Sequence, residues 1–355
     1  MRGHLPLSLV MTVMTSILIA GCNDKKDNIV LPDYLSSAEC ERLDGTEILV
    51  GEELGMPGQL WCFGDTLVIS DVTPEFLYAV CSVSGDSVIS GCVRRGEGPG
   101  ELIRAGYLQK SDRNGILLFD DMSRRLYRYD SLERFIHPVD TARSEIIEDA
   151  TGGYLYETPQ GYVGDVHYGD GHIMDFIGKN GKKISSFGQV PGTETGSDVQ
   201  PDFYMAYQAQ FCSSPDGHAI CAAGMFHDWL AFFDVSSTPV KTREYFSSGP
   251  QVEASGSGEN YHLRTLPSTV SHYWSMAPWR KGVYVLYIGA TETEIESKGY
   301  YCKILSYDWD GNFKGAYSVG EKIGSIASSD NGKTIYAVSF PEAYPESKIF
   351  RYDLR

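Results

Sequence analysis

The side chains best placed to do chemistry are four charged residues in one glycine-rich stretch, residues 94–102. Arg94, Arg95, Glu97 and Glu101 bring two positive and two negative charges into nine residues. Three glycines and a proline in the same stretch exclude a helix or the middle of a strand. A phosphate-binding loop would continue into Lys-Ser/Thr and a helix, and neither follows. We therefore predict a turn whose charged side chains either pair with one another or contact a ligand.

A second candidate set is aromatic and follows the longest segment that we expect to be irregular, residues 247–268. Tyr273 and Trp274 come soon after this segment, and Trp279 follows them. Long loops often carry binding residues, and exposed aromatic rings can stack on sugars or peptides. The alternative is that Trp274 and Trp279 pack inside the fold.

The sequence contains no clear pattern for a metal site or a catalytic nucleophile. The eight histidines form no His-x-x-x-His pair, and no Cys-x-x-Cys occurs. Acidic residues and histidines alternate within a short span at Asp165, His167, Asp170 and His172. They could lie on one face of a hairpin or in an exposed turn, and we favour the exposed turn. Residues 254–258 lack the first glycine of a Gly-x-Ser-x-Gly elbow. We expect no metal, no cofactor and no catalytic residue.

The cysteines other than Cys22 number seven. Cys212 and Cys221 flank a hairpin turn. A two-residue loop at 216–217 would place them directly opposite each other, whereas a three-residue loop that starts at Pro215 would shift the register and separate them. We favour the second loop and predict that the cysteines are small buried residues.

The N-terminus has the pattern of an export signal. Residues 5–20 carry no charge and are too few for a convincing membrane span. Residues 18–22 read Leu-Ile-Ala-Gly-Cys, which resembles the bacterial lipobox, whose cysteine is lipidated. We predict a signal peptide over 1–21, lipid attachment at Cys22 with a tether over 22–40, and one domain over 41–355. The alternative is an ordinary cleaved signal with a chance cysteine. Resemblance to lipoproteins implies the outer membrane of a Gram-negative cell, facing either the periplasm or the outside.

The remainder of the chain predicts an all-β fold built from repeats. Short apolar or alternating runs recur between Asn-Gly and Asp-Gly turns. The Pro-Gly-x-Leu core at Pro57 returns at Pro99 after 42 residues, and a partial copy at Pro191 follows after 92, which is twice 46. Such steps fit four-stranded propeller blades of about 40–50 residues.

Counting in this phase predicts a six-bladed β-propeller of four-stranded antiparallel blades. The units span 61–101, 102–145, 146–192, 203–250, 268–320 and 321–355. The last unit is one strand short, whereas residues 46–50 form a strand without a blade. We therefore predict that 46–50 completes the last blade and closes the ring, which removes open sheet edges. A seven-bladed ring is the alternative.

Two short motifs of the chain resemble those of a known family. Residues 95–102, Arg-Gly-Glu-Gly-Pro-Gly-Glu-Leu, resemble the signature of TolB-like six-bladed β-propeller lipoproteins of gut-type Gram-negative bacteria. Residues 214–217, Ser-Pro-Asp-Gly, resemble a turn of TolB-type blades. The resemblance implies a fold and a place in the cell envelope, but fold alone does not supply an activity.

The expected function is a non-catalytic binding or scaffold module of the cell envelope. Its partner would be a protein or a glycan, and the net charge of −17 argues against nucleic acid. The alternative is a hydrolase or lyase acting on carbohydrate at the channel mouth. Two facing carboxylates in a cleft would favour that enzyme, and an apolar or tyrosine-lined rim would favour binding. The candidate ligand-binding residues are Arg94, Arg95, Glu97, Glu101, Tyr273 and Trp274.

Overall fold

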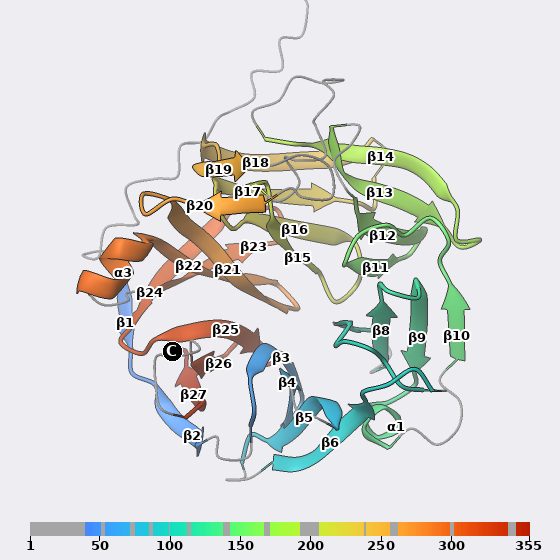
Figure 1. Cartoon of the computed structure of the whole chain (residues 1–355), viewed down its shortest axis with the longest axis horizontal. Coiled ribbons are helices and arrows are strands. Elements are labelled where there is room, and N and C mark those ends of the chain that lie inside the picture. Colours follow the sequence, from blue (N-terminus) through green and yellow to red (C-terminus); the bar gives the residue numbers. More distant parts are fainter. Residues whose placement is uncertain are drawn as a thin grey trace, which may run out of the picture.

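The computed structural model describes residues 40–50, 54–71, 75–84, 88–98, 100–111, 115–137, 143–166, 171–191, 206–237, 239–255, 262–298, 302–339 and 346–355. In this part of the chain, six sheets stand around a common centre as the blades of a propeller (Figure 1). The prediction of a six-bladed β-propeller is confirmed. The predicted signal peptide, Cys22 and nearly all of the tether lie outside the described residues.

The strands follow one another from the centre outward in each blade. Blades 1 to 3 comprise β3 (Pro57–Phe63), β4 (Thr66–Asp71), β5 (Phe76–Ser82), β6 (Val88–Arg94); β7 (Tyr107–Lys110), β8 (Ile116–Asp120), β9 (Arg125–Tyr129), β10 (Arg143–Ile146); and β11 (Leu155–Thr158), β12 (Gly161–Asp165), β13 (His172–Gly178), β14 (Lys183–Gln189). Blades 4 to 6 comprise β15 (Ala209–Ser213), β16 (Ala219–Gly224), β17 (Asp228–Asp234), β18 (Lys241–Ser248); β21 (Val270–Trp279), β22 (Gly282–Thr291), β23 (Lys303–Asp308), β24 (Phe313–Val319); and β25 (Ile323–Ser328), β26 (Thr334–Ser339), β27 (Lys348–Asp353). The remaining elements are β1 (Glu41–Leu43), β2 (Thr46–Val50), β19 (Val252–Ser255), β20 (His262–Thr265), α1 (Leu132–Ile136) and α3 (Glu292–Lys298). Within the described residues, no helix has both the length and the apolar character needed to cross a membrane.

Among the described residues, six clusters of buried apolar side chains hold the ring together. Each cluster combines residues from two neighbouring blades, so every blade packs on both of its faces. Between blades 3 and 4, for example, Tyr156, Phe211 and Trp229 are all buried. Burying one large apolar side chain contributes about 1.5–3 kcal/mol. The blades therefore stabilise one another.

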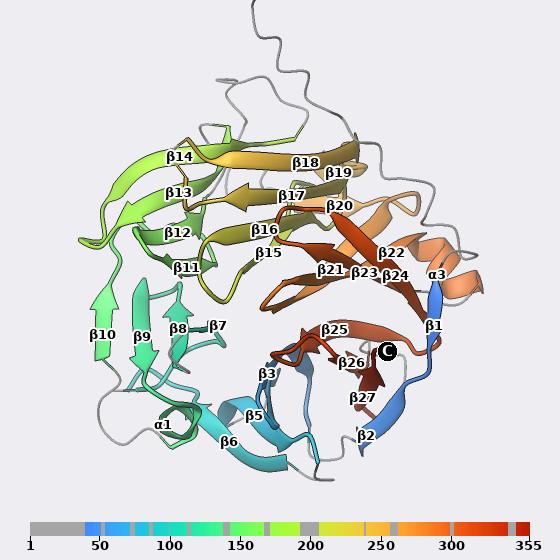
Figure 2. The ribbon, with the colours of Figure 1, turned by 180° about the vertical axis from the view of Figure 1, so that it is seen from behind.

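The ring closes between the first and last parts of the chain. β2 pairs antiparallel with β27, with Thr46 opposite Arg351. The Lys348 ammonium and the Glu47 carboxylate lie 2.8 Å apart across this pair. Figure 2 shows the same closure from behind, with the N-terminal strands beside the C-terminal ones. The predicted role of residues 46–50 is confirmed.

Two short pairings were not expected from the sequence. β1 adds to the outer edge of blade 5 by pairing parallel with β24, and it buries Leu43 between blades 5 and 6. β19 and β20 form a hairpin inside the segment 247–268, so the prediction that this segment is irregular is wrong. Strands of three and four residues are too short to show a clear alternation in sequence.

The predicted register of the β15–β16 hairpin is also wrong, because Cys212 pairs directly with Cys221. The Ser214 carbonyl accepts a hydrogen bond from the Gly217 N–H at 2.9 Å, and the Ser214 N–H donates to the Ala219 carbonyl at 2.8 Å. The Ser214 hydroxyl in turn accepts from the Ala219 N–H at 2.9 Å. The bonds between Ser214 and Ala219 extend the ladder by one pair beyond Ser213 and Ile220 and leave residues 215–218 as the loop.

Candidate functional site

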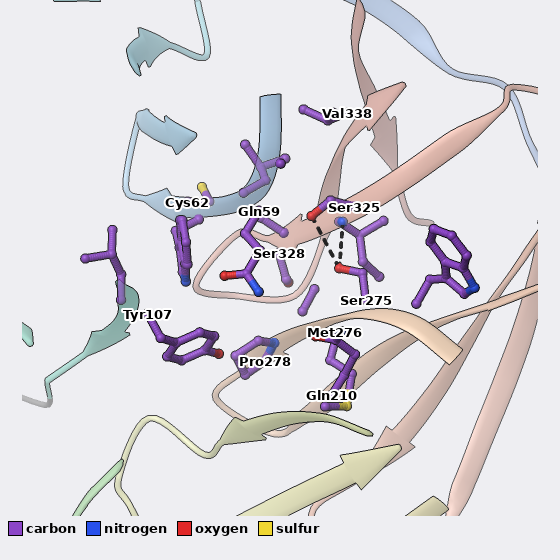
Figure 3. A pocket seen from close by; sticks show the side chains of 18 of the residues that line it. Gln59, Cys62, Tyr107, Gln210, Ser275, Met276, Pro278, Ser325, Ser328 and Val338 are labelled. Carbon is purple, nitrogen blue, oxygen red and sulfur yellow. Dashed lines mark hydrogen bonds between the residues drawn. The ribbon is translucent and has the colours of Figure 1, made fainter. Parts of the chain in front are cut away.

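The centre of the ring contains a cavity of about 260 Å³. Its walls come mainly from the inner strands of five blades, β3, β7, β15, β21 and β25 (Figure 3). The volume exceeds the ~150 Å³ that hold one benzene molecule. A small ligand or one large side chain of a partner would therefore fit.

The lining of this cavity joins apolar groups with neutral polar groups. None of the described residues that line it is an Asp or a Glu. The one charged residue among these described lining residues is Lys110, which forms an ion pair with Asp330. The Lys110 ammonium lies 5.3 Å from the centre of the Phe63 ring. The cavity is therefore suited to a ligand without a net charge, because burying an uncompensated charge there would be costly.

Tyr107 anchors the aromatic side of the cavity. Its ring makes edge-to-face contacts with Trp61 at 5.9 Å and with Tyr154 at 5.0 Å between ring centres. The Tyr107 hydroxyl donates to the Phe211 carbonyl at 3.5 Å. Burial raises the pKa of Tyr107, so the hydroxyl stays neutral. This interlocked geometry presents a rigid aromatic wall.

Gln109 ties three blades together beside the cavity. Its amide nitrogen donates to the Ser213 hydroxyl at 2.9 Å, and its amide oxygen accepts from the Glu157 N–H at 2.9 Å. The side chain is buried, so these bonds satisfy groups that would otherwise be costly to bury. Gln109 therefore positions the cavity walls and has little capacity left for a ligand.

Two other glutamines differ in how much hydrogen-bonding capacity they keep. The Gln210 amide accepts from the Tyr154 hydroxyl at 3.0 Å and donates to the Met225 sulfur at 3.4 Å. Gln59 is half-buried, and its amide makes no hydrogen bond within the described part of the chain. Figure 3 shows the Gln59 amide directed into the cavity. Gln59 is thus the clearest polar group available to a ligand.

Serine hydroxyls form the polar part of the opposite wall. The Ser275 hydroxyl accepts from the Ile326 N–H at 3.1 Å and lies 3.4 Å from the Ser325 hydroxyl (Figure 3). Both serines are nearly buried. Their lone pairs and protons leave room for a further partner in the cavity.

A second hollow of about 610 Å³ shares Lys110, Pro215 and Pro278 with the first. It is lined by the hairpin turns that follow the inner strands and by the start of α1, so it forms a mouth of the central cavity. Two carboxylates line it, those of Glu133 and Asp330, and Asp330 is the partner of Lys110.

Of the charged residues predicted as ligand contacts, Arg94 ends β6 and the other three lie in the turn between β6 and β7, as the sequence indicated. Arg94 pairs with Glu75 at 3.2 Å, and the Arg95 guanidinium donates to the Ile103 carbonyl at 3.2 Å. The Glu101 carboxylate accepts from the Gly98 N–H at 3.0 Å.

The same Glu101 carboxylate explains one glycine of the turn. A Cβ at Gly96 would lie only 2.0 Å from a Glu101 oxygen. Glu97 is exposed. None of the four charged residues lines either hollow, so their contact with a ligand stays a prediction.

The two aromatic candidates have different places. Tyr273 is buried, and its hydroxyl donates to an Asp228 carboxylate oxygen at 3.0 Å. Trp274 lines the central cavity and also packs against the cluster between blades 5 and 6. Trp279 lines the mouth and stacks on Tyr284 with ring centres 6.0 Å apart.

The cavity residues that the sequence analysis missed are mostly amides and hydroxyls within apolar strands. Gln59, Gln109 and Gln210 each interrupt the inner strand of a blade. The signal available in the sequence was a neutral polar residue that recurs within the inner strand of several blades. Of the alternating set, Asp165 is buried and its carboxylate accepts from the Tyr154 N–H at 2.7 Å, whereas His167 and Asp170 lie outside the described residues. No three His, Cys, Asp or Glu side chains in the described ranges are grouped as metal ligands.

A buried histidine lies apart from the cavity, where β16 turns into β17. His227 is 0% exposed, and neither ring nitrogen has a hydrogen-bond partner in the described chain. Burial, and secondly the nearby His272, lowers the pKa of His227 to about 3. The unfolded chain would bind a proton at the ordinary value near 6.5, so stability is lost as pH falls from about 6.5 towards 3.

We expect this histidine to cost roughly 2 kcal/mol of stability at pH 5, at about 1.4 kcal/mol per pH unit. Asp165 acts in the opposite direction. Burial raises the pKa of Asp165 to about 7, so this group makes the protein more stable as the pH falls. The effect of His227 is therefore isolated by comparing two proteins, His227→Gln and wild type. The urea midpoint of unfolding is measured for each at pH 7 and at pH 5, and the difference between the proteins is compared between the two pH values. The variant should gain on wild type at pH 5, whereas exposed His137→Gln should not. An equal difference at both pH values would refute the assignment.

The comparisons with known proteins agree with this geometry. The chain matches the family described as TolB-like 6-blade propeller-like over residues 46–331, and it belongs to that family. Among curated proteins, none matches the sequence.

Two of the solved structures that share this fold come from Bacteroides species. One is a member of the DUF4221 family from Bacteroides vulgatus, with a TM-score of 0.55, 11% identity, and coverage of 89% of this chain and 98% of that one. The other is a Bacteroides fragilis protein described as exported, with a TM-score of 0.52, 12% identity, and coverage of 88% and 95%. At these identities the likeness shows the fold alone.

Proposed function

We propose that this protein is a non-catalytic lipoprotein of the cell envelope that binds a neutral glycan unit in the central cavity. The observation that carries the proposal is the lining, in which aromatic rings and neutral amides converge without a carboxylate. Aromatic faces stack on the apolar face of a sugar, and amides and hydroxyls bond its hydroxyl groups. The lipobox-like residues 18–22 and the fold shared with an exported protein support the envelope address.

Hydrolysis is the weaker candidate. A glycosidase needs a general acid and a second carboxylate beside the scissile bond. The central cavity supplies neither among the described residues that line it. At the mouth, Asp330 is held by Lys110, which leaves Glu133 without a second free carboxylate among the described lining residues.

The test combines a glycan array with calorimetry on the best glycan. Gln59→Ala removes the cavity amide with spare hydrogen-bonding capacity and should weaken binding about 3- to 10-fold. Trp274→Ala removes an aromatic wall and should weaken it about tenfold or more. Gln160→Ala is the matched control, because the exposed Gln160 side chain bonds the Ser236 carbonyl and lies outside the cavity.

Three outcomes would contradict the proposal. Glycan affinity that Gln59→Ala leaves unchanged would place the site elsewhere. Capture of a protein partner with no glycan bound would make the module a protein scaffold. Turnover of a polysaccharide that Glu133→Gln abolishes would make the protein a hydrolase.

A further inference from the structure

One pair of cysteines faces each other across two neighbouring strands. Cys212 on β15 and Cys221 on β16 are directly paired in the antiparallel ladder, and both side chains are 0% exposed. Directly opposed residues have Cα atoms about 4.5–5.5 Å apart, which lies within the range that a disulfide spans. Both side chains also belong to the same buried cluster between blades 4 and 5.

No other pair of cysteines in the described ladders is arranged in this way. In blade 1, Cys62 lies opposite Leu67, Cys81 opposite Val88 and Cys92 opposite Tyr78. Cys40 comes directly before β1, and Cys302 directly before β23. The geometry therefore selects one pair out of seven cysteines.

We propose that Cys212 and Cys221 are a modification site that closes into a disulfide as the exported chain folds. The oxidant is the disulfide of an envelope thiol oxidoreductase or of oxidised glutathione. Two S–H bonds break and one S–S bond forms, and the two electrons and two protons pass to the oxidant, which leaves as two thiols. The in-cell part of this inference rests on the envelope address in the proposed function, because disulfides persist in oxidising compartments.

The timing follows from the surroundings of the pair. Burial, and secondly the influence of Cys212, raises the pKa of Cys221 well above its ordinary value. The thiolate is the form that attacks a disulfide, so the folded, reduced protein reacts slowly. The bond therefore forms before β16 is covered by its neighbours.

The disulfide would also stiffen one wall of the central cavity. Cys212 lies between Phe211 and Ser213, and both of these residues line the cavity. Its sulfur is 3.9 Å from the sulfur of Met276, another lining residue. A cross-link from β15 to β16 would hold these groups in their observed register.

The deciding experiment refolds the reduced, urea-unfolded full chain in a glutathione redox buffer. Free thiols are then trapped with N-ethylmaleimide, and peptides are analysed by mass spectrometry. We expect the peptide that contains both Cys212 and Cys221 to have a mass 2 Da below that of its reduced form. Incubating the folded, reduced protein should form the link at least about tenfold more slowly. If N-ethylmaleimide labels both cysteines after refolding, their thiols are free, and the proposal is overturned.

Two variants and a second protein sample test the cysteine pairing independently of the proposed location in the cell envelope. Cys212→Ser should abolish the link, and Cys92→Ser should preserve it; the wild-type peptide decides the matter even if Cys212→Ser does not fold. The same trapping is applied to protein taken from the envelope of cells that export it. A link in the refolded sample but reduced cysteines in the cellular sample would locate the error in the proposed address and leave the pair assigned.

Discussion

A chain that begins at residue 51, and so lacks β1 and β2, is expected to lose roughly 5 kcal/mol of stability or more. β2 supplies the outer strand of blade 6, and β1 buries Leu43 between blades 5 and 6. Without them β27 becomes an open edge, whose unpaired N–H and C=O groups are a template for pairing with other chains. We expect the melting temperature to fall by more than about 5 °C and soluble aggregates to form.

A chain that begins at residue 40 is the matched control, because it keeps both strands and lacks the predicted signal and tether. Differential scanning fluorimetry and size-exclusion chromatography compare the two under the same conditions. The longer chain should melt as a monodisperse protein. Equal melting temperatures for both chains would show that the ring does not depend on its N-terminal strands.

Cys22→Ser is expected to move the protein from the membrane fraction to the soluble fraction. Each buried CH₂ group of an acyl chain contributes about 0.8 kcal/mol, so several chains on one residue hold a protein firmly where a single chain holds it only marginally. Loss of these acyl chains should therefore release nearly all of the protein.

Cys40→Ser controls for the loss of a cysteine near the N-terminus and should leave the protein with the membrane. Fractionation, followed by mass analysis of the mature N-terminus, reports both location and lipid. Membrane retention of Cys22→Ser at wild-type levels would contradict lipid anchoring at this residue. A signal cleaved elsewhere, with Cys22 unmodified, would support the ordinary export signal instead.

The architecture of this protein could be predicted from local features of the chain. The glycines and proline of residues 94–102 predict a turn between two blades. The similar Pro-Gly-x-Leu motif at Pro57 sets the phase of the repeat. The strand at 46–50 has no blade of its own, which predicts ring closure, and its pairing with β27 confirms this. These features depend on φ/ψ preferences and apolar alternation within a few residues, so they can be read without the fold.

The candidate site could not be predicted, because its parts meet only when the ring closes. Gln59, Gln109 and Gln210 come from three blades and are up to 151 residues apart in sequence. The charged turn at 94–102 is conspicuous in sequence, yet its residues bond one another and their neighbours outside the cavity. Polar residues in apolar strands gain significance only from what lies opposite them in space.

The opposition of Cys212 and Cys221 shows the same limit at a smaller scale. Two loop lengths were compatible with the sequence, and the structure has the register in which Cys212 pairs with Cys221 and the Ser214 hydroxyl accepts from the Ala219 N–H. Local periodicity is enough to predict the longer strands, the blade phase and the closing strand. The cavity and the cysteine register follow from the folded ring alone, because both depend on which distant or cross-strand groups come into contact.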